Sequence, residues 1–248
     1  MENEAKSPAQ HEAQKRSNSL VLSYQALQQF LGWLGLALPL SLAGYSLVSS
    51  HPLRPSISDY YYSPMGDIFV GILCAIGVFL LFYRGYDPLP GEKISDRQVS
   101  FVAGLAALGV AGFPAHRLGL PICYPTADDC LTFGITTHPN WLHDSCAGVF
   151  FICLALFCLV LFTRGDRSAD HKIIWTPRNR IFVTCGTVIV LSLLALLPTM
   201  LSPGLRQSLA PLHYVFWCET IGILAFAISW LVKGKAHETV ANLVHRAM

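Results

Sequence analysis

Side chains that can do chemistry interrupt an otherwise apolar sequence at a small number of places. The stretch PSISDYYYSPMGDIFVG, residues 55–71, holds two carboxylates and three consecutive tyrosines directly before an apolar run. An imidazole and a carboxylate, His143 and Glu219, lie near the start of later apolar runs. An imidazole that a carboxylate orients can act as a general base, for example in acyl transfer. Asp59, His143 and Glu219 are therefore candidate catalytic residues.

Seven further polar residues in the same places are candidates for substrate binding. They are Ser58, Tyr60, Tyr61, Tyr62, Asp67, Asp144 and His213. Each kind of residue also has a structural interpretation. Tyrosine rings are common in the headgroup layer of a membrane, an aspartate at the start of a helix caps it, and His143 could simply donate to a neighbouring carbonyl.

A metal site is the second chemical hypothesis. His116, His143 and His213 each lie near one end of an apolar run, and zinc accepts three histidines plus a water that it activates. This set predicts a zinc-dependent intramembrane hydrolase, although the sequence has no paired spacing such as H-x-x-x-H. The segment CYPTADDC adds Cys123 and Cys130, which could form a disulfide in an oxidising compartment.

The composition indicates what must position these residues. Hydrophobic residues make up 53% of the 248 residues and charged residues 13%, whereas a soluble domain has about a quarter charged residues. A helix needs roughly 20 residues to cross a bilayer, and six apolar segments approach that length: 27–49, 67–86, 99–117, 141–163, 180–202 and 211–232. We expect an all-α membrane protein, a six-transmembrane-helix bundle over residues 25–235.

The distribution of basic residues predicts the orientation. Of the 17 Lys and Arg residues, all but Arg54, Arg117 and Arg206 fall on the side of the termini. Basic residues stay on the cytoplasmic side, so both termini are expected to be cytoplasmic, in a plasma or inner membrane. Residues 1–24 are expected to form a disordered tail and residues 236–248 a second tail. The net charge of +2 argues against a nucleic-acid partner.

Two patterns describe the predicted bundle. Ala103, Ala107, Ala111 and Ala115 recur every four residues, so the third segment has a smooth face for close helix packing. Within the predicted spans, nearly all ionisable residues lie at the extracytoplasmic end. Glu219 lies six residues beyond His213, about 9 Å along a helix. Such residues are costly in a membrane and mark functional sites by default.

The stretch SISDYYYSPMGDIFVGILCAIGVFLLFYRGY resembles the entry of the second helix in the Frag1/DRAM/Sfk1 superfamily of six-span membrane proteins. The resemblance is carried by Pro55, Ile57, Ser58, Asp59, Pro64, Phe69, Tyr83 and Arg84, with His143 and Glu219 at matching later places. The chain is also similar to the bacterial membrane proteins grouped as DUF998. The three tyrosines, and Thr220 after Glu219, depart from the pattern. The resemblance implies a lipid context, because members are linked to lipid-anchor remodelling, trafficking and autophagy.

The first hypothesis is therefore a membrane protein in which Asp59, His143 and Glu219 form an outward-facing polar pocket for a lipid headgroup. Membrane lipid is its expected partner, and lipid remodelling its expected context. The zinc hydrolase is one alternative. A non-catalytic scaffold, whose polar residues only hold the helices together, is the other. The sequence leaves open whether the protein is an enzyme.

Overall fold

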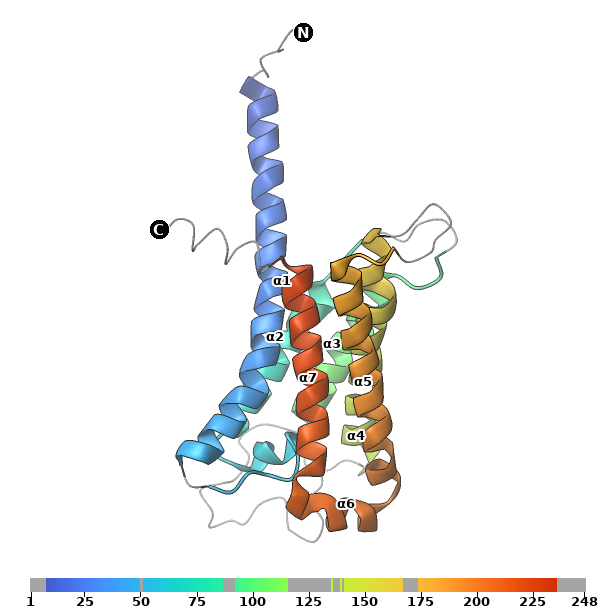
Figure 1. Cartoon of the computed structure of the whole chain (residues 1–248). Helices are drawn as coiled ribbons and strands as arrows, with labels where there is room; N and C mark the ends of the chain where they lie inside the picture. The colour runs from blue at the N-terminus through green and yellow to red at the C-terminus, as the bar shows by residue number, and fades with distance from the viewer. Residues whose placement is uncertain are drawn as a thin grey trace.

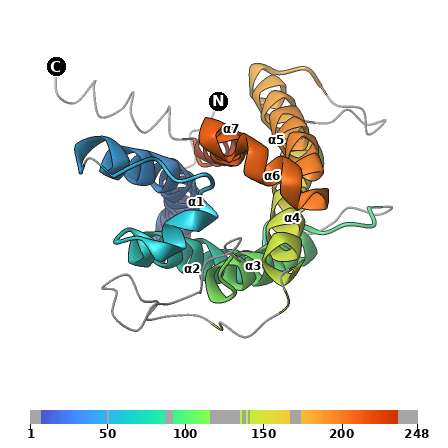
Figure 2. The same cartoon turned by 90° about the horizontal axis from the view of Figure 1, so that it is seen from below.

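The computed structural model describes residues 8–49, 51–86, 92–115, 135, 139, 141–166 and 174–235, with the backbone alone for residues 8–20. The described residues are mostly helical and contain no strand. Their long helices are α1 (Pro8–Val48), α2 (Gly66–Phe82), α3 (Asp96–Gly112), α4 (Trp141–Leu156), α5 (Pro177–Leu201) and α7 (Tyr214–Lys233). Each packs against the next in this order, and α7 packs against α1, which closes a ring (Figure 2).

Short elements lie at the two ends of this ring. The 3-10 helix η1 (Ser58–Tyr62), the helix α6 (Pro203–Leu209) and the turn η4 (Ala210–Leu212) lie at one end, called the η1 end below. At the other end, α4 continues through a π-helical turn, η2 (Phe157–Leu161), into a 3-10 turn, η3 (Phe162–Asp166). The N-terminal part of α1 projects from this η3 end, where α7 also ends (Figure 1).

Four helices are long and apolar enough to cross a membrane: Val21–Val48, Trp141–Gly165, Pro177–Leu201 and Tyr214–Lys233. The helix α2 is apolar but has 17 residues, and α3 also has 17. A helix of this length spans about 25 Å, less than a hydrocarbon core of about 30 Å. Each of the six predicted segments contains a helix, but the described residues provide four such spans. The all-helical prediction is confirmed, and the chain is a multi-pass membrane protein.

The first helix begins earlier than the sequence analysis predicts. Residues 8–24, expected to be disordered, belong to α1, which starts at Pro8. Proline fits the first position of a helix, and residues 9–31 contain neither proline nor glycine. Alanine, glutamine, glutamate and lysine in this segment favour a helix without requiring apolar burial. Residues 1–7 and the predicted tail 236–248 lie outside the described residues.

The small-residue face of α3 is confirmed. Ala103, Ala107 and Ala111 are fully buried, and Ala115 just beyond the helix is 2% exposed. Glycines bring α2 and α3 still closer, because a Cβ added to Gly104 would lie 2.7 Å from the carbonyl oxygen of Gly77. α3 ends at the η1 end, where Ala111 and the residues just after the helix supply carbonyl groups to the site.

Candidate functional site

The loop before η1 is bound to the first turns of α7. The Phe216 N–H donates to the Pro55 carbonyl at 2.9 Å, and the Ile57 N–H donates to Oε2 of Glu219 at 2.7 Å. Nδ1 of His213 lies 3.3 Å from the Arg54 carbonyl oxygen and donates to it, because a carbonyl only accepts. The first N–H groups of a helix have no acceptor within the helix, so the loop supplies one for α7.

The residue after Ile57 is held by α4. Nε2 of His143 lies 2.9 Å from Oγ of Ser58, and Nδ1 lies 2.6 Å from the Phe113 carbonyl oxygen. Because that carbonyl can only accept, Nδ1 carries the proton. In a neutral imidazole Nε2 is then the acceptor of the Ser58 hydroxyl proton. His143 is 2% exposed and Ser58 6%, so this pair is almost fully enclosed.

The three consecutive tyrosines point into the protein. Tyr60, Tyr61 and Tyr62 are 1%, 4% and 2% exposed, so they do not form a belt in the headgroup layer. The Tyr61 and Tyr62 hydroxyls donate to the carbonyls of Ala111 and Ala115, at 3.1 and 2.9 Å, near the end of α3. The Tyr60 hydroxyl lies 2.5 Å from Oγ of Ser46 on α1. The bonds from Tyr61 and Tyr62 satisfy carbonyls at and just beyond the end of α3, where intrahelical partners are missing. Burial raises the pKa of Tyr61 to about 12.

Charged side chains surround this junction. Oδ2 of Asp59 accepts a hydrogen bond from the Ser56 hydroxyl at 2.9 Å. Arg206, on α6, lies 3.8 Å from Oδ2 of Asp144, on α4. The charges of Arg206, Asp59 and Asp144 all interact with that of Glu219. Asp67, in the first turn of α2, is exposed.

The predicted catalytic residues thus gather at one end of the bundle but have other direct partners than expected. Glu219 and His143 hold consecutive loop residues, and Asp59 turns back to Ser56 within its own loop. A backbone carbonyl, not a carboxylate, orients the imidazole, as the structural interpretation of His143 predicts. Sequence reasoning missed the Phe113 carbonyl and Arg206. A backbone acceptor has no sequence signal, and Arg206 counted only as a loop charge.

In the described part of the chain, no three His, Cys, Asp or Glu side chains are placed to hold a metal ion. Both ring nitrogens of His143 have hydrogen-bond partners, whereas His116 lies outside the described residues. The predicted disulfide partners Cys123 and Cys130 also lie outside them.

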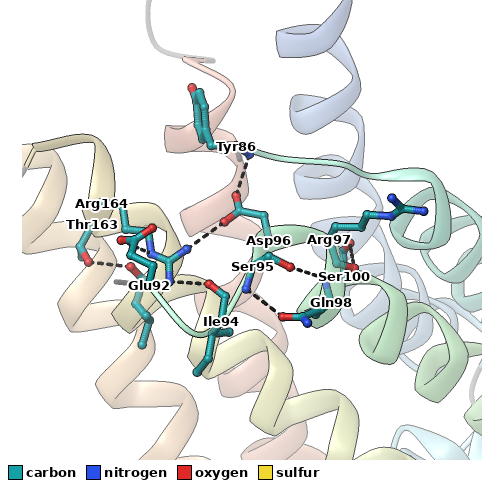
Figure 3. A network of polar contacts seen from close by, with 11 residues as sticks. Tyr86, Glu92, Ile94, Ser95, Asp96, Arg97, Gln98, Ser100, Thr163 and Arg164 are labelled. Carbon is teal, nitrogen blue, oxygen red and sulfur yellow. Dashed lines mark hydrogen bonds and ion pairs between the residues drawn. The ribbon is translucent and has the colours of Figure 1, made fainter. Parts of the chain in front are cut away.

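A second polar cluster, which the sequence analysis does not predict, lies at the η3 end (Figure 3). Arg164 in η3 forms ion pairs with Glu92 at 3.1 Å and with Asp96 at 3.6 Å, and donates to the Ile94 carbonyl at 2.6 Å. Asp96 is 1% exposed and accepts the Tyr86 N–H at 3.3 Å. Burial raises the pKa of Asp96, and the Tyr86 N–H, Lys233 and Arg164 partly oppose this rise.

The end of α7 adds a second cation to this cluster. Nζ of Lys233 lies 4.9 Å from the ring centre of Tyr86 and 5.0 Å from that of Phe162, and the residue is 8% exposed. Cation–π contacts of this kind stabilise an ammonium group away from water. The cluster therefore joins α3, η3 and α7 by enclosed charges.

No curated protein and no solved structure matches the chain. A family described as "Protein of unknown function (DUF998)" matches residues 32–224, which is more than half of the chain. The match includes the loop before η1, His143 and Glu219. The chain is therefore a member of the DUF998 family.

Proposed function

We propose that this DUF998 protein binds the headgroup of a zwitterionic membrane phospholipid at its η1 end. The observation that carries the proposal is the junction at Ile57 and Ser58, where side chains of α7 and α4 hold one loop in place. In this proposal Asp59, Glu219 and Arg206 contact the headgroup. His143 supports the loop from beneath.

The charges at this end favour a headgroup that carries an ammonium group. The described residues there include the carboxylates of Asp59, Asp67, Asp144 and Glu219, against the guanidinium groups of Arg54 and Arg206. Of the two carboxylate oxygens of Glu219, only Oε2 accepts a hydrogen bond from the described residues. The residue is partly exposed. A headgroup ammonium could donate to Oε1, and a phosphate could pair with Arg206 through charge-assisted hydrogen bonds.

Apolar side chains beside the junction suit the acyl chains of such a lipid. Trp141, Leu212 and Trp217 are 64%, 67% and 50% exposed. Tryptophan is enriched where membranes meet water, so these residues suit the boundary between headgroups and acyl chains. The resemblance of residues 57–59 to the Frag1/DRAM/Sfk1 motif also supports a lipid context.

The proposal includes a topology of six spans with both termini in the cytoplasm, so that the η1 end faces outward. Two observations support it. The basic residues are concentrated on the side of the termini, and each of the six apolar segments contains one helix of the ring. The short α2 and α3 are then accommodated by local thinning of the bilayer or by packing among longer helices.

Lipid retention tests the proposed function. The full chain, purified in mild detergent, is incubated with phosphatidylethanolamine or phosphatidylglycerol, and retained lipid is counted by native mass spectrometry. We expect preferential retention of phosphatidylethanolamine, and at least a fivefold loss of that preference in Glu219→Gln. The matched control is Glu92→Gln, the same change at the η3 end. Equal retention of the two lipids by the wild type would refute the proposal.

A further inference from the structure

We propose that Ser58 is a nucleophile and His143 its general base, acting on the acyl ester of a bound phospholipid. This inference rests on the proposed lipid site and names its chemistry. Ser58 and His143 come from positions 85 residues apart, and their side chains meet at 2.9 Å between Oγ and Nε2. A nucleophile needs its base within about 2.6–3.2 Å, so this pair has a reactive separation.

The second hydrogen bond of His143 fixes the form of the imidazole that such a base requires. The Phe113 carbonyl, 2.6 Å from Nδ1, keeps the proton on that nitrogen. The lone pair of Nε2 then faces the Ser58 hydroxyl. In serine hydrolases a third group orients the base in this way, and here the Phe113 carbonyl, just after α3, does so.

Ser41, Ser63 and Ser229 satisfy their hydroxyls differently from Ser58. The hydroxyls of Ser41, Ser63 and Ser229 each donate to a backbone carbonyl three residues earlier, within the same segment. Such local bonds are the ordinary arrangement for serine in and near helices. Ser58 instead donates to a side chain on another element. The Ser58 hydroxyl therefore lies beside an imidazole, which can take up its proton as a base. A backbone carbonyl cannot act as a base in this way.

The depth of the pair suits an ester substrate. His143 lies two residues after the exposed Trp141, about 3 Å along α4. Trp141 suits the boundary of the bilayer, and the ester groups of phospholipids lie just below their headgroups. A headgroup bound at Glu219 and Arg206 would therefore bring an acyl ester toward Ser58.

The reaction proceeds in two balanced steps. Oγ of Ser58 attacks the ester carbonyl carbon while Nε2 of His143 takes the hydroxyl proton. The bond from the carbonyl carbon to the glycerol oxygen breaks, and His143 returns the proton to that oxygen. Water, or the hydroxyl group of a second lipid, then attacks the acyl-serine with its proton passing to His143. The acyl group leaves, and Ser58 recovers its proton.

Covalent labelling tests this assignment. The full chain in detergent is treated with an alkyl fluorophosphonate, which forms a serine–phosphorus bond and releases fluoride, and adducts are mapped by peptide mass spectrometry. We expect an adduct on Ser58 that is absent in Ser58→Ala. In His143→Gln the labelling rate falls about 10²-fold or more, because a general base contributes about 10²–10⁴-fold. Ser63→Ala, which removes a hydroxyl just after η1, labels like the wild type.

Each outcome of the labelling supports or overturns the assignment of Ser58 and His143. Heat-denatured wild type supplies the reactivity of Ser58 without its base, so the comparison holds even if His143→Gln does not fold. No adduct on Ser58 in the folded wild type, or equal rates in folded and denatured protein, overturns the assignment. If phosphatidylethanolamine is still retained in that case, the proposed lipid binding stands without the catalytic pair. An adduct on Ser58 without preferential retention of phosphatidylethanolamine would instead support the catalytic pair and refute the proposed headgroup binding.

Discussion

Ile57 and Glu219 are joined by a single hydrogen bond of 2.7 Å across 162 positions of the sequence. The donor is a backbone N–H in the loop before η1, and the acceptor is a carboxylate in the second turn of α7. The next loop residue, Ser58, bonds to His143 of α4. Two different helices of the ring thus fix adjacent residues, and the position of the loop depends on both.

Replacing Glu219 by alanine should destabilise the protein by about 1–3 kcal/mol, because the buried Ile57 N–H loses its acceptor. Glu219→Gln keeps a carbonyl oxygen at the same place, so it should recover most of this loss. Unfolding by denaturant in detergent, followed by circular dichroism, measures both free energies. Equal losses in the two variants would show that the charge of Glu219, not the hydrogen bond, holds the loop.

Tyr62→Phe should cost about 1 kcal/mol of unfolding free energy, because it removes one buried hydrogen bond to the Ala115 carbonyl. Tyr86→Phe is the matched control. Its side chain is 61% exposed and keeps the ring that contacts Lys233, so its stability should stay within about 0.5 kcal/mol of the wild type. Thermal unfolding in detergent compares them. A Tyr62→Phe protein as stable as the control would mean that the loop is held without this hydroxyl.

The sequence is sufficient to locate the helices because long apolar segments in this composition have few alternatives to membrane helices. It also predicts the buried alanine face of α3, since a repeat of four places side chains on one side of a helix. The early start of α1 is missed because the segment lacks the apolar residues by which spans are recognised. Helix propensity alone distinguishes it from a disordered tail.

The sequence predicts which residues form the site, but not which groups they contact. Ser58 and His143 are both candidates in the sequence, yet their contact depends on how the loop lies on α4, which no local pattern encodes. The η3-end cluster is missed for a different reason. The predicted spans stop at residues 163 and 232, so Arg164 and Lys233 count as loop charges one residue beyond each span, whereas packing encloses both.

Arg164→Gln should destabilise the protein by about 3 kcal/mol, because Asp96 remains buried without its guanidinium partner. Adding Asp96→Asn should restore part of this loss, with a coupling free energy of about 1–3 kcal/mol between the two positions. Denaturant unfolding of the two single variants and the double variant measures the coupling. The exposed Arg97 provides the control, since Arg97→Gln should change stability by less than about 0.5 kcal/mol. Additive losses would show that Lys233 alone neutralises Asp96.

The pH dependence of stability should carry a signature of Asp96. Burial raises its pKa above the ordinary 3.8, so the folded state holds this proton more tightly than the unfolded state. Below pH 3.8 Asp96 is protonated in both the folded and the unfolded state, so it does not lower the free energy of unfolding. As pH rises from there through the folded-state pKa, the free energy of unfolding falls, with a slope of at most about 1.4 kcal/mol per pH unit, and then levels off.

Asp96→Asn removes that titration. As pH rises from 4 to 7, the free energy of unfolding of the wild type should therefore fall relative to that of the variant. The charged groups that face Asp96 include Arg164, Lys233 and Glu92, and Glu92 is the other carboxylate among them. Making both proteins in a Glu92→Gln background therefore isolates Asp96. Parallel stability curves for the two would mean that the cations of η3 and α7 keep Asp96 ionised, in spite of its burial, throughout this range.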